Sequence, residues 1–491
     1  MLELMAIFSL VISSLGFYLH ARKVNQKTLT LDSFMVADGT LNKREFANTW
    51  VASSFSLAMN VMFLLSSSNN YGLWILVSPI TYVGGFVFFN WVVKKSNFDL
   101  KNSRTLADFF YLIYPSRAIA RLVTALTLGS YIMLLFVELY MGTVVLTVFL
   151  GDGVIYKTLA FFSIGMLVLM LVRLGGYLCI IYTDRQQLLL IILAVSSIFL
   201  YGFMCPVANN SSAFDILIDI TQYKENPLVF MIWLSVINFV YPFSQLANYQ
   251  RVTATKCANT SFLGVVSGSR KLLMLFLLTI GGFLLLGAKG YQANTITEFL
   301  MLVKNSDGAI SYLFVPLILG FGSMIYSSAD VAVIATFYSL SDMNTFRDRF
   351  SKLNENELRK VLTVSTIILL LVLTLIYFLQ IGGLEAWLMP LIYTIVGQLA
   401  ILVPVPLYIL VQEIRGKELS EMQVNRKNTL ILFNGIIFSW VMLFVSAYIS
   451  KVTGNPYWSL LSMPVGIVIV FCSILLLNLK KNRKLIVFTD R

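Results

Sequence analysis

The stretch 51-VASSFSLAMNVMFLLSSSNNYGLW-74 is apolar enough to enter a membrane, yet small polar residues interrupt it. Ser53, Ser56, Asn60 and the serine and asparagine run 66–70 make it a poor continuous lipid-facing helix. Interrupted helices are tolerated in a bilayer only where the freed backbone lines a cavity inside the protein. The stretch therefore predicts a broken membrane helix beside such a cavity.

A second interrupted stretch, 234-LSVINFVYPFSQLANYQR-251, lies five expected spans further along the chain. Pro242 and Gln245 fall within its apolar run. Two such helices fit the first members of two inverted five-helix repeats, an arrangement that places a binding site at the midplane between them. The alternative is that these polar residues only pack helices or bond to backbone carbonyls. The matched pair favours the site.

The rest of the chain indicates an all-α polytopic membrane protein. Of its 491 residues, 58% are hydrophobic and 12% are charged, whereas a soluble protein carries about 25% charged residues. This excludes a soluble enzyme, a disordered protein and a secreted disulfide scaffold. Continuous apolar runs such as 361–379 lack the alternation of outer-membrane strands. With about 20 residues per helix, we expect about thirteen spans, near 3–20, 46–71, 73–93, 118–150, 157–175, 178–203, 227–248, 262–288, 310–339, 361–380, 386–412, 429–450 and 458–479.

The basic residues predict how these spans are oriented. With the N-terminus outside and the C-terminus inside, all but five of the 36 Lys and Arg residues fall on the inner side, as the positive-inside rule requires. The five outer ones are Lys157, Lys224, Lys289, Lys304 and Lys451. The net charge of +12 therefore reflects topology and contact with an anionic lipid bilayer. It does not indicate a nucleic-acid partner.

We expect one transmembrane transporter domain over residues 1–491. Residues 1–45 form an extra first helix and inner loop, and residues 429–491 form two extra helices and a basic tail. The first inverted repeat, spans 2–6, covers 46–203, and the second, spans 7–11, covers 227–412. A Walker-type phosphate loop is absent from the sequence, which argues against an ATP-driven pump.

Polar and acidic residues inside spans are costly and usually mark function. Asp184 lies in the apolar run 174–192, and Ser327, Ser328 and Asp330 lie together in 320–342. Hydroxyl and carboxylate oxygens are hard donors that suit an alkali cation. Asp330 follows Ser327 by three positions, so both lie on one helical face. Glu138 is a further buried acid, for which three roles stay open: meeting a cationic solute, pairing with a lysine, or facing an aqueous cavity.

At these residues the sequence resembles the sodium/solute symporter family. The glycine pair and the string that follows it resemble that family's sixth helix, and Ser-Ser-Ala-Asp at 327–330 resembles its Ser-Thr-Ala-Asp sodium-site helix. The matching positions of the sixth helix are Gly175, Gly176, Tyr182, Thr183, Asp184 and Gln187. The segments 32–42 and 250–256 also resemble family motifs. The resemblance covers spans 1–9 in order and implies a LeuT-like inverted-repeat fold.

The resemblance also implies a cation site. The family's main sodium site corresponds here to the hydroxyls of Ser327 and Ser328, the backbone carbonyl of Met324, and carbonyls in the first break near Ser53 and Ser56. Some members hold a second sodium near the inside. Here Asp184 would supply the carboxylate for a second sodium or a proton, with Ser327 and Asp330 close by. The alternative for Asp184 is a packing carboxylate paired with an arginine.

The resemblance is less informative about the solute. Gln245 matches a glutamine that faces the solute in several members. Phe55 stands where proline carriers have an acid and sugar carriers an amide, which puts both substrates in doubt. We expect Gln245, Phe55, Asn60, Phe63 and Phe243 to contact the solute. The middle of the expected spans contains no Lys or Arg, which disfavours a simple anionic solute.

These observations predict a sodium-coupled symporter of a small organic solute in the bacterial cytoplasmic membrane, working by alternating access. Sodium is the coupling ion, and no resident cofactor is expected. One alternative is a proton-coupled symporter of the same fold, with Asp184 and Asp330 as proton carriers. Another is a transporter-like solute receptor. A membrane enzyme is disfavoured because the single histidine, His20, has no partner residues nearby in the sequence.

Overall fold

The computed structural model describes residues 2–24, 31–96, 105–151, 153–207, 227–291, 293–341, 355–379, 396–417, 424, 429–453 and 463–477. Within these residues the regular elements are helices, and the one isolated β-bridge joins Leu41 to Thr255. The expectation of an all-α polytopic membrane protein is confirmed. Lys224, the residues 380–395 and the tail 478–491 lie outside the described residues.

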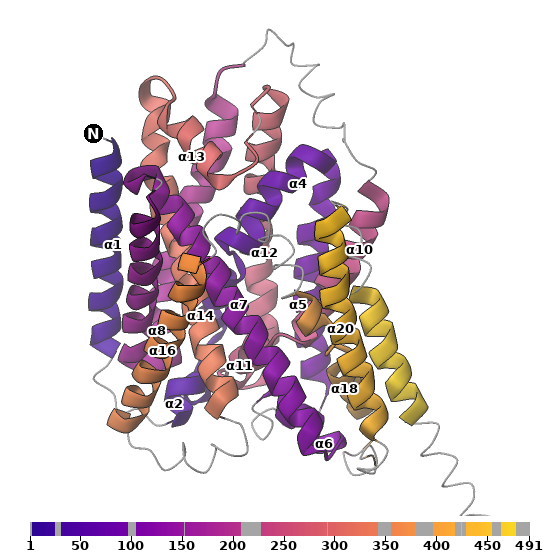
Figure 1. The fold of residues 1–491 in the computed structure, drawn as a ribbon. Coiled ribbons are helices and arrows are strands. Elements are labelled where there is room, and N and C mark those ends of the chain that lie inside the picture. The colour runs from indigo at the N-terminus through magenta and orange to yellow at the C-terminus, as the bar shows by residue number, and fades with distance from the viewer. Residues whose placement is uncertain are drawn as a thin grey trace, which may run out of the picture.

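The long helices form one bundle (Figure 1). The α-helices are α1 (Leu2–Val24), α2 (Leu31–Val36), α3 (Lys43–Ser54), α4 (Phe63–Tyr71), α5 (Val77–Lys95), α6 (Leu106–Ile113), α7 (Arg117–Leu150), α8 (Val154–Met204), α10 (Pro227–Val240), α11 (Leu246–Thr253), α12 (Ala258–Ala288), α13 (Ile296–Lys304), α14 (Phe314–Ser341), α16 (Glu355–Leu379), α18 (Pro404–Ile414) and α20 (Leu430–Thr453). A further apolar helix spans Met463–Leu477. Nine described helical segments are long and apolar enough to cross a membrane, or ten if the bent pair α10 and α11 counts as one span.

The helix α8 is two membrane spans joined at a glycine pair. Its 51 residues would extend for roughly 77 Å at 1.5 Å per residue, more than twice the ~30 Å hydrocarbon core. Gly175 (φ −166°) and Gly176 (φ +55°) leave the helical region. A Cβ atom at Gly176 would stand 2.3 Å from the carbonyl oxygen of Phe34, so the residue needs both the left-handed φ and the missing side chain. The two halves correspond to the expected spans 157–175 and 178–203.

The run Leu57–Lys95 also comprises two spans, which part at Gly72 (φ +54°). With this division, each expected span overlaps at least one described helix.

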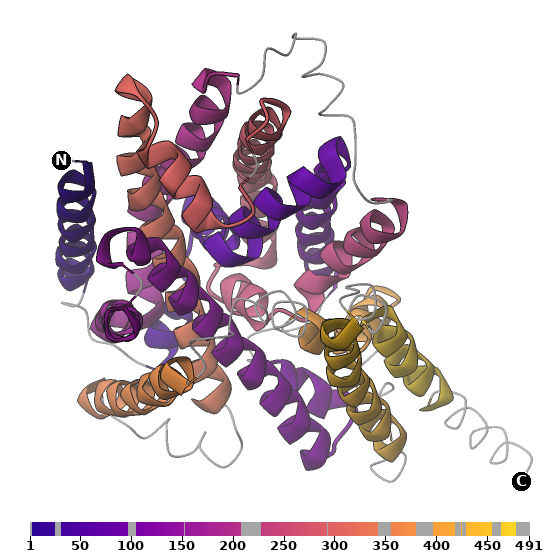
Figure 2. The same ribbon diagram turned by 45° about the horizontal axis from the view of Figure 1, so that its top comes forward.

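The spatial order places the extra helices at opposite edges. Helix α1 stands at one edge, where it packs on α8 and α14, and α20 with the helix at 463–477 forms the other edge (Figures 1 and 2). Helix α14 packs along α8 and α7 in the interior. The candidate site lies where α3, α7, α8, α10, α11 and α14 approach one another.

Hydrogen bonds and one ion pair join segments that are distant in the sequence at each end of the bundle. At one end, Lys304 forms an ion pair with Glu3, and Lys289 donates to the carbonyls of Phe203 and Cys205 at 2.7 Å each. Lys289 and Lys304 thus share the end where the chain begins. At the other end, the Leu41 amide, just before α3, donates to the carbonyl of Ala254, just after α11, at 2.9 Å.

Candidate solute and cation site

The first expected break is present between α3 and α4. Helix α3 ends at Ser54, Phe55 and Ser56 have non-helical backbone angles, and a π-helical turn, Leu57–Met62, leads into α4. The Asn60 side-chain amide donates to the Ser54 carbonyl at 2.8 Å, and the Ser56 hydroxyl accepts from the Met59 amide at 3.0 Å. Side chains of the break therefore satisfy backbone groups that the missing helical turn leaves open.

Glu138 of α7 contacts the first break. The Ser56 hydroxyl donates a short hydrogen bond to Glu138 Oε1, whereas Oε2 is buried without a hydrogen-bond partner among the described residues. Glu138 is fully buried, and among the described residues no charged group interacts with it. Its carboxylate thus faces the N-terminus of the helix that restarts after the break, the end that favours negative charge. Of the three roles left open, neither a lysine partner nor an aqueous cavity is seen in the described structure.

The second expected break is also present. Helix α10 ends at Val240, a 3₁₀ turn covers Tyr241–Phe243, and α11 begins at Leu246, bent by 43°. Pro242 has no N–H and cannot continue the helix. The Asn248 side chain donates to the Pro242 carbonyl at 3.0 Å, the Tyr249 hydroxyl donates to the Phe243 carbonyl at 2.6 Å, and the Ala247 amide donates to the Tyr131 hydroxyl at 2.9 Å.

A cavity of ≈ 140 Å³ lies between the two breaks. Its polar lining consists of hydroxyl and amide side chains and one guanidinium: Ser53, Ser54, Ser56, Asn60, Ser78, Tyr82, Tyr131, Asn238, Tyr241, Gln245, Arg251 and Ser328. The Gln245 amide donates to the Tyr241 hydroxyl at 3.3 Å, while its buried carbonyl oxygen has no partner among the described residues. The described lining contains no carboxylate, so the cavity offers hydrogen bonds rather than a negative charge.

The structure brings three of the five expected solute contacts to this cavity. Asn60, Phe63 and Gln245 line it. Phe55 instead packs edge-on against Phe276 with ring centroids 5.2 Å apart, and Phe243 packs against Phe89 at 5.3 Å. Both rings are buried outside the lining, because the break turns each of them from the cavity into the packing between helices.

The expected cation ligands lie beside the cavity, between α14, α8 and α3. The Ser327 hydroxyl donates to Asp184 Oδ1 at 2.7 Å, and both side chains are fully buried. Asp184 Oδ2, the Ser328 hydroxyl and both oxygens of Asp330 are buried without a partner among the described residues. Met324 is buried one turn earlier on α14. Ser328 is shared with the cavity lining, so the two sites adjoin.

Arg251 also reaches this region, and its position overturns the sequence-based expectation about an anionic solute. It belongs to α11, whose N-cap is Gln245, and it lines the cavity, although the expected span 227–248 ended before it. Its guanidinium donates to Asn248 Oδ1 at 3.0 Å and to the Ser53 hydroxyl at 2.6 Å. The Ser53 hydroxyl in turn donates to the Thr49 carbonyl at 2.6 Å. The argument against an anionic solute, which rested on the lack of a central cation, therefore no longer holds.

The charges of this cluster do not balance. Asp184 and Asp330 interact electrostatically, and Arg251 is the cation that acts on both of them among the described residues. A buried carboxylate without a counter-charge is strongly unfavourable. If both acids are ionised, the cluster has room for one more positive charge. The unpartnered oxygens are the atoms that a bound cation would use.

Several lining residues were not expected from the sequence. Tyr82 and Tyr131 sit in ordinary apolar runs, where an aromatic ring usually indicates packing. The Asn238 side chain donates to both the carbonyl and the hydroxyl of Ser78 at 3.1 Å. This link between α10 and α5 depends on the fold, and local sequence gives no signal for it.

No family model matches the sequence, and no curated protein does either. Among solved structures, the chain is similar to a Na⁺-coupled sialic acid symporter in a substrate-bound outward-open state. The TM-score is 0.71 at 12% identity, over 96% of this chain and 98% of that one. This chain shares the fold of that symporter. It is also similar to a manganese transporter of Eremococcus coleocola, with a TM-score of 0.54 at 14% identity, over 91% of this chain and 98% of that one.

These structural similarities establish the fold alone and leave the function, the solute and the coupling ion to chemical argument. Both similar proteins are transporters by name, in agreement with the expectation of a transporter rather than an enzyme. Ligand sites at the midplane between discontinuous helices are the usual arrangement in transporters built from inverted repeats. The cavity between the two breaks occupies that place.

Proposed function

We propose that the protein is a secondary active transporter that couples sodium entry to the uptake of a small polar organic solute. The observation that carries the proposal is the buried cluster of Asp184, Ser327, Ser328 and Asp330, with unpartnered oxygens beside the first helix break. A cation that completes this cluster would remove an unfavourable buried charge. The similar sialic acid symporter is Na⁺-coupled by its name, which supports sodium as that cation.

The cation would have the following ligands. Ser327 and Ser328 supply hydroxyls, Met324 supplies a backbone carbonyl, and the break near Ser53 and Ser56 supplies further carbonyls. Asp184 supplies negative charge through Ser327, or directly to a second sodium or a proton together with Asp330. Hard oxygen ligands of this kind suit an alkali cation. Among the described residues, no three His, Cys, Asp or Glu side chains come together, so the donor set fits sodium better than a divalent metal ion.

The solute would bind in the ≈ 140 Å³ cavity. Its hydroxyl and amide lining suits a compact molecule with several hydrogen-bonding groups, and Gln245 offers an unpartnered carbonyl oxygen to a donor. Ser328 belongs to both sites, so a solute and a cation would each favour the same closed arrangement of α3 and α14. That shared contact couples the two ligands.

The energy available from one sodium ion is sufficient for accumulation. Moving one charge through 100 mV contributes about 2.3 kcal/mol, and a tenfold sodium gradient adds about 1.4 kcal/mol. Together they sustain a solute ratio of roughly several hundred.

A second candidate is proton-coupled transport through the same cluster. The neighbouring carboxylates of Asp184 and Asp330, with Arg251 as their shared cation, are a pair that a single proton would also neutralise. This candidate predicts uptake without sodium and with a strong dependence on pH. A receptor of the same fold would bind the solute without moving it across the membrane.

The experiment that tests the proposal is thermal unfolding of the purified protein in increasing sodium, with potassium as the control ion. A ligand that binds only the folded state raises the melting temperature with its concentration. We expect this rise for the parent and its loss in the double variant Ser327→Ala/Ser328→Ala. Ser323→Ala is the matched control, because Ser323 lies one turn earlier on α14 and its hydroxyl donates to the Leu319 carbonyl at 2.9 Å.

The possible outcomes separate the candidates. A sodium response that Ser323→Ala keeps and the double variant loses supports the cation site. If sodium and potassium act alike on the parent, sodium coupling is rejected. A response to pH that is lost in Asp330→Asn then favours the proton.

A further inference from the structure

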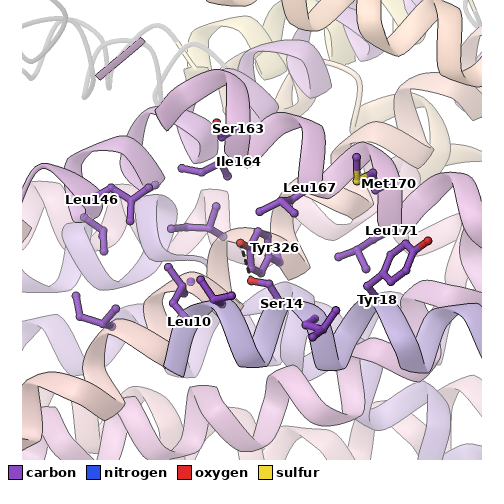
Figure 3. A pocket seen from close by; sticks show the side chains of 17 residues that line it. Leu10, Ser14, Tyr18, Leu146, Ser163, Ile164, Leu167, Met170, Leu171 and Tyr326 are labelled. Carbon is purple, nitrogen blue, oxygen red and sulfur yellow. Dashed lines mark hydrogen bonds between the residues drawn. The ribbon is translucent and has the colours of Figure 1, made fainter. Parts of the chain in front are cut away.

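A hollow larger than the solute cavity lies elsewhere in the bundle. A second cavity, of ≈ 430 Å³, lies between α1, α7, α8 and α14 and shares no lining residue with the first. Figure 3 shows Leu10 and Ser14 of α1 facing Leu146 of α7, Leu167 of α8 and Tyr326 of α14 across it. A volume of this size is typical of a binding site for a small molecule or part of a larger one.

The lining is too apolar to hold water. Ser14 Oγ and the Tyr326 hydroxyl bond to each other at 3.2 Å (Figure 3), which uses the polar pair nearest the centre. Nearly all other lining side chains are aliphatic. A buried water needs two to four polar partners, and apolar cavities stay dry. The occupant must therefore be apolar itself.

The position of the cavity indicates which apolar molecule can reach it. Its lining residues lie in the middle of α1 and α14, at the depth of the hydrocarbon core. At its mouth, Val11 (59% exposed), Leu15 (54%) and Met170 (46%) face outward. The cavity thus opens sideways toward the lipid, so the apolar molecules next to its mouth are lipid acyl chains.

We propose that this cavity is a binding site for one acyl chain of a membrane phospholipid, held between α1 and the transporter core. The inference does not depend on the coupling ion or the solute. The acyl chain would lie beside α1, a helix that is mostly exposed. Only 11% of its most apolar 18-residue stretch is buried. It would also contact Tyr326, the residue directly before Ser327 on α14.

The test uses the full-length protein in vesicles of phosphatidylethanolamine and phosphatidylglycerol that contain a phospholipid with a diazirine at mid-chain. After irradiation, labelled residues are identified by peptide mass spectrometry. We expect several-fold more labelling at Leu15, Leu167 and Met170 than at Phe8 of α1 and Leu193 of α8. The two controls are exposed at 68% and 51% on the same helices but lie outside the cavity. Equal labelling at both sets would mean ordinary annular lipid and would overturn the site.

A filling variant gives a second readout. Ser163 lies at the exposed rim of the cavity, so Ser163→Phe places a ring in the space of the chain, and Ser163→Ala is the matched control without added volume. We expect the phenylalanine variant to lose most of the labelling at Leu167 and Met170 while labelling at Leu193 stays unchanged. If Ser163→Phe labels as the alanine variant does, the acyl chain is not held in this cavity. If Ser163→Phe does not fold, the comparison within the parent protein still decides.

Discussion

The side chain of Glu138 reaches from α7 to the point where the first broken helix restarts. It accepts a hydrogen bond from the Ser56 hydroxyl, in a place closed to solvent. Buried donors without an acceptor cost about 1–3 kcal/mol each. The residue is therefore expected to hold the geometry of the break, and with it the carbonyls that we assign to the cation.

Replacing Glu138 tests this role. Glu138→Gln keeps an acceptor of the same shape for Ser56, so we expect stability to change by less than about 1 kcal/mol. Glu138→Leu leaves the Ser56 hydroxyl without its acceptor and should lower stability by about 1–3 kcal/mol. Denaturant unfolding of the detergent-solubilised variants measures the difference. Equal stability of the two variants would show that the acceptor is dispensable.

At the scale of single residues, the sequence predicts which residue types form the site better than it predicts where each side chain points. Asp184 and Ser327 were expected to lie together, and their side chains are hydrogen-bonded. Polar groups inside a span are expensive, so their presence is itself informative. Phe55 and Phe243 were expected at the solute and pack elsewhere, because the local angles of each break decide where a ring points. Such angles have no signature in a single sequence.

At the scale of elements, the glycine breaks determine the path of the chain. Gly176 has φ +55°, and the space where its Cβ would lie is taken by Phe34. Gly151 has a similar φ of +73° but open space around it. The two glycines therefore separate the cost of the backbone angle from the cost of the contact.

Gly176→Ala and Gly151→Ala should differ in stability. For Gly151→Ala we expect a loss of about 1–3 kcal/mol, because φ +73° with ψ −176° is a region that essentially only glycine adopts. For Gly176→Ala the contact with the Phe34 backbone adds to it, and we expect several-fold more destabilisation or failure to fold. Melting temperatures of the two variants in one detergent provide the comparison. Similar values would mean that Phe34 moves aside freely.

Both helix breaks were predictable from sequence at this scale. Serine and asparagine runs in one apolar stretch, and Pro242 in the other, conflict with a continuous lipid-facing helix. The bond from the Asn60 side chain to the Ser54 carbonyl shows how the first conflict is resolved. The π-helical turn at Leu57–Met62 was not predictable, since it has no signature in a single sequence.

At the scale of the whole molecule, two cysteines can report the orientation of the chain in the membrane. Cys257, between α11 and α12, is exposed and on the side expected to face the cytoplasm. Cys205 is buried at the opposite end, next to Lys289. The Thr260 hydrogen bond lowers the pKa of the Cys257 thiol, whereas burial raises the pKa of the Cys205 thiol.

We expect a membrane-impermeant maleimide to label Cys257 in inside-out vesicles and not in intact cells. Because only the thiolate reacts, a lowered pKa places the rise of the labelling rate at a lower pH than for a free cysteine. Cys257→Ser is the control and should abolish the signal in inside-out vesicles. Labelling of Cys257 in intact cells would reverse the assigned orientation, and the inner and outer sides of the mechanism with it.

The glycine pair in α8 also bears on how the protein is made. Helix runs into helix there with no connecting loop, across Gly175 and Gly176 alone. A ribosome delivers the first half before the second, yet no spare chain separates them that would let the first half settle alone in its final place. We expect the two halves to enter the bilayer as a hairpin, which would place Asp184 in the interior before its partner Ser327 has been synthesised. During that interval the carboxylate must be protonated or shielded by something other than its final neighbours.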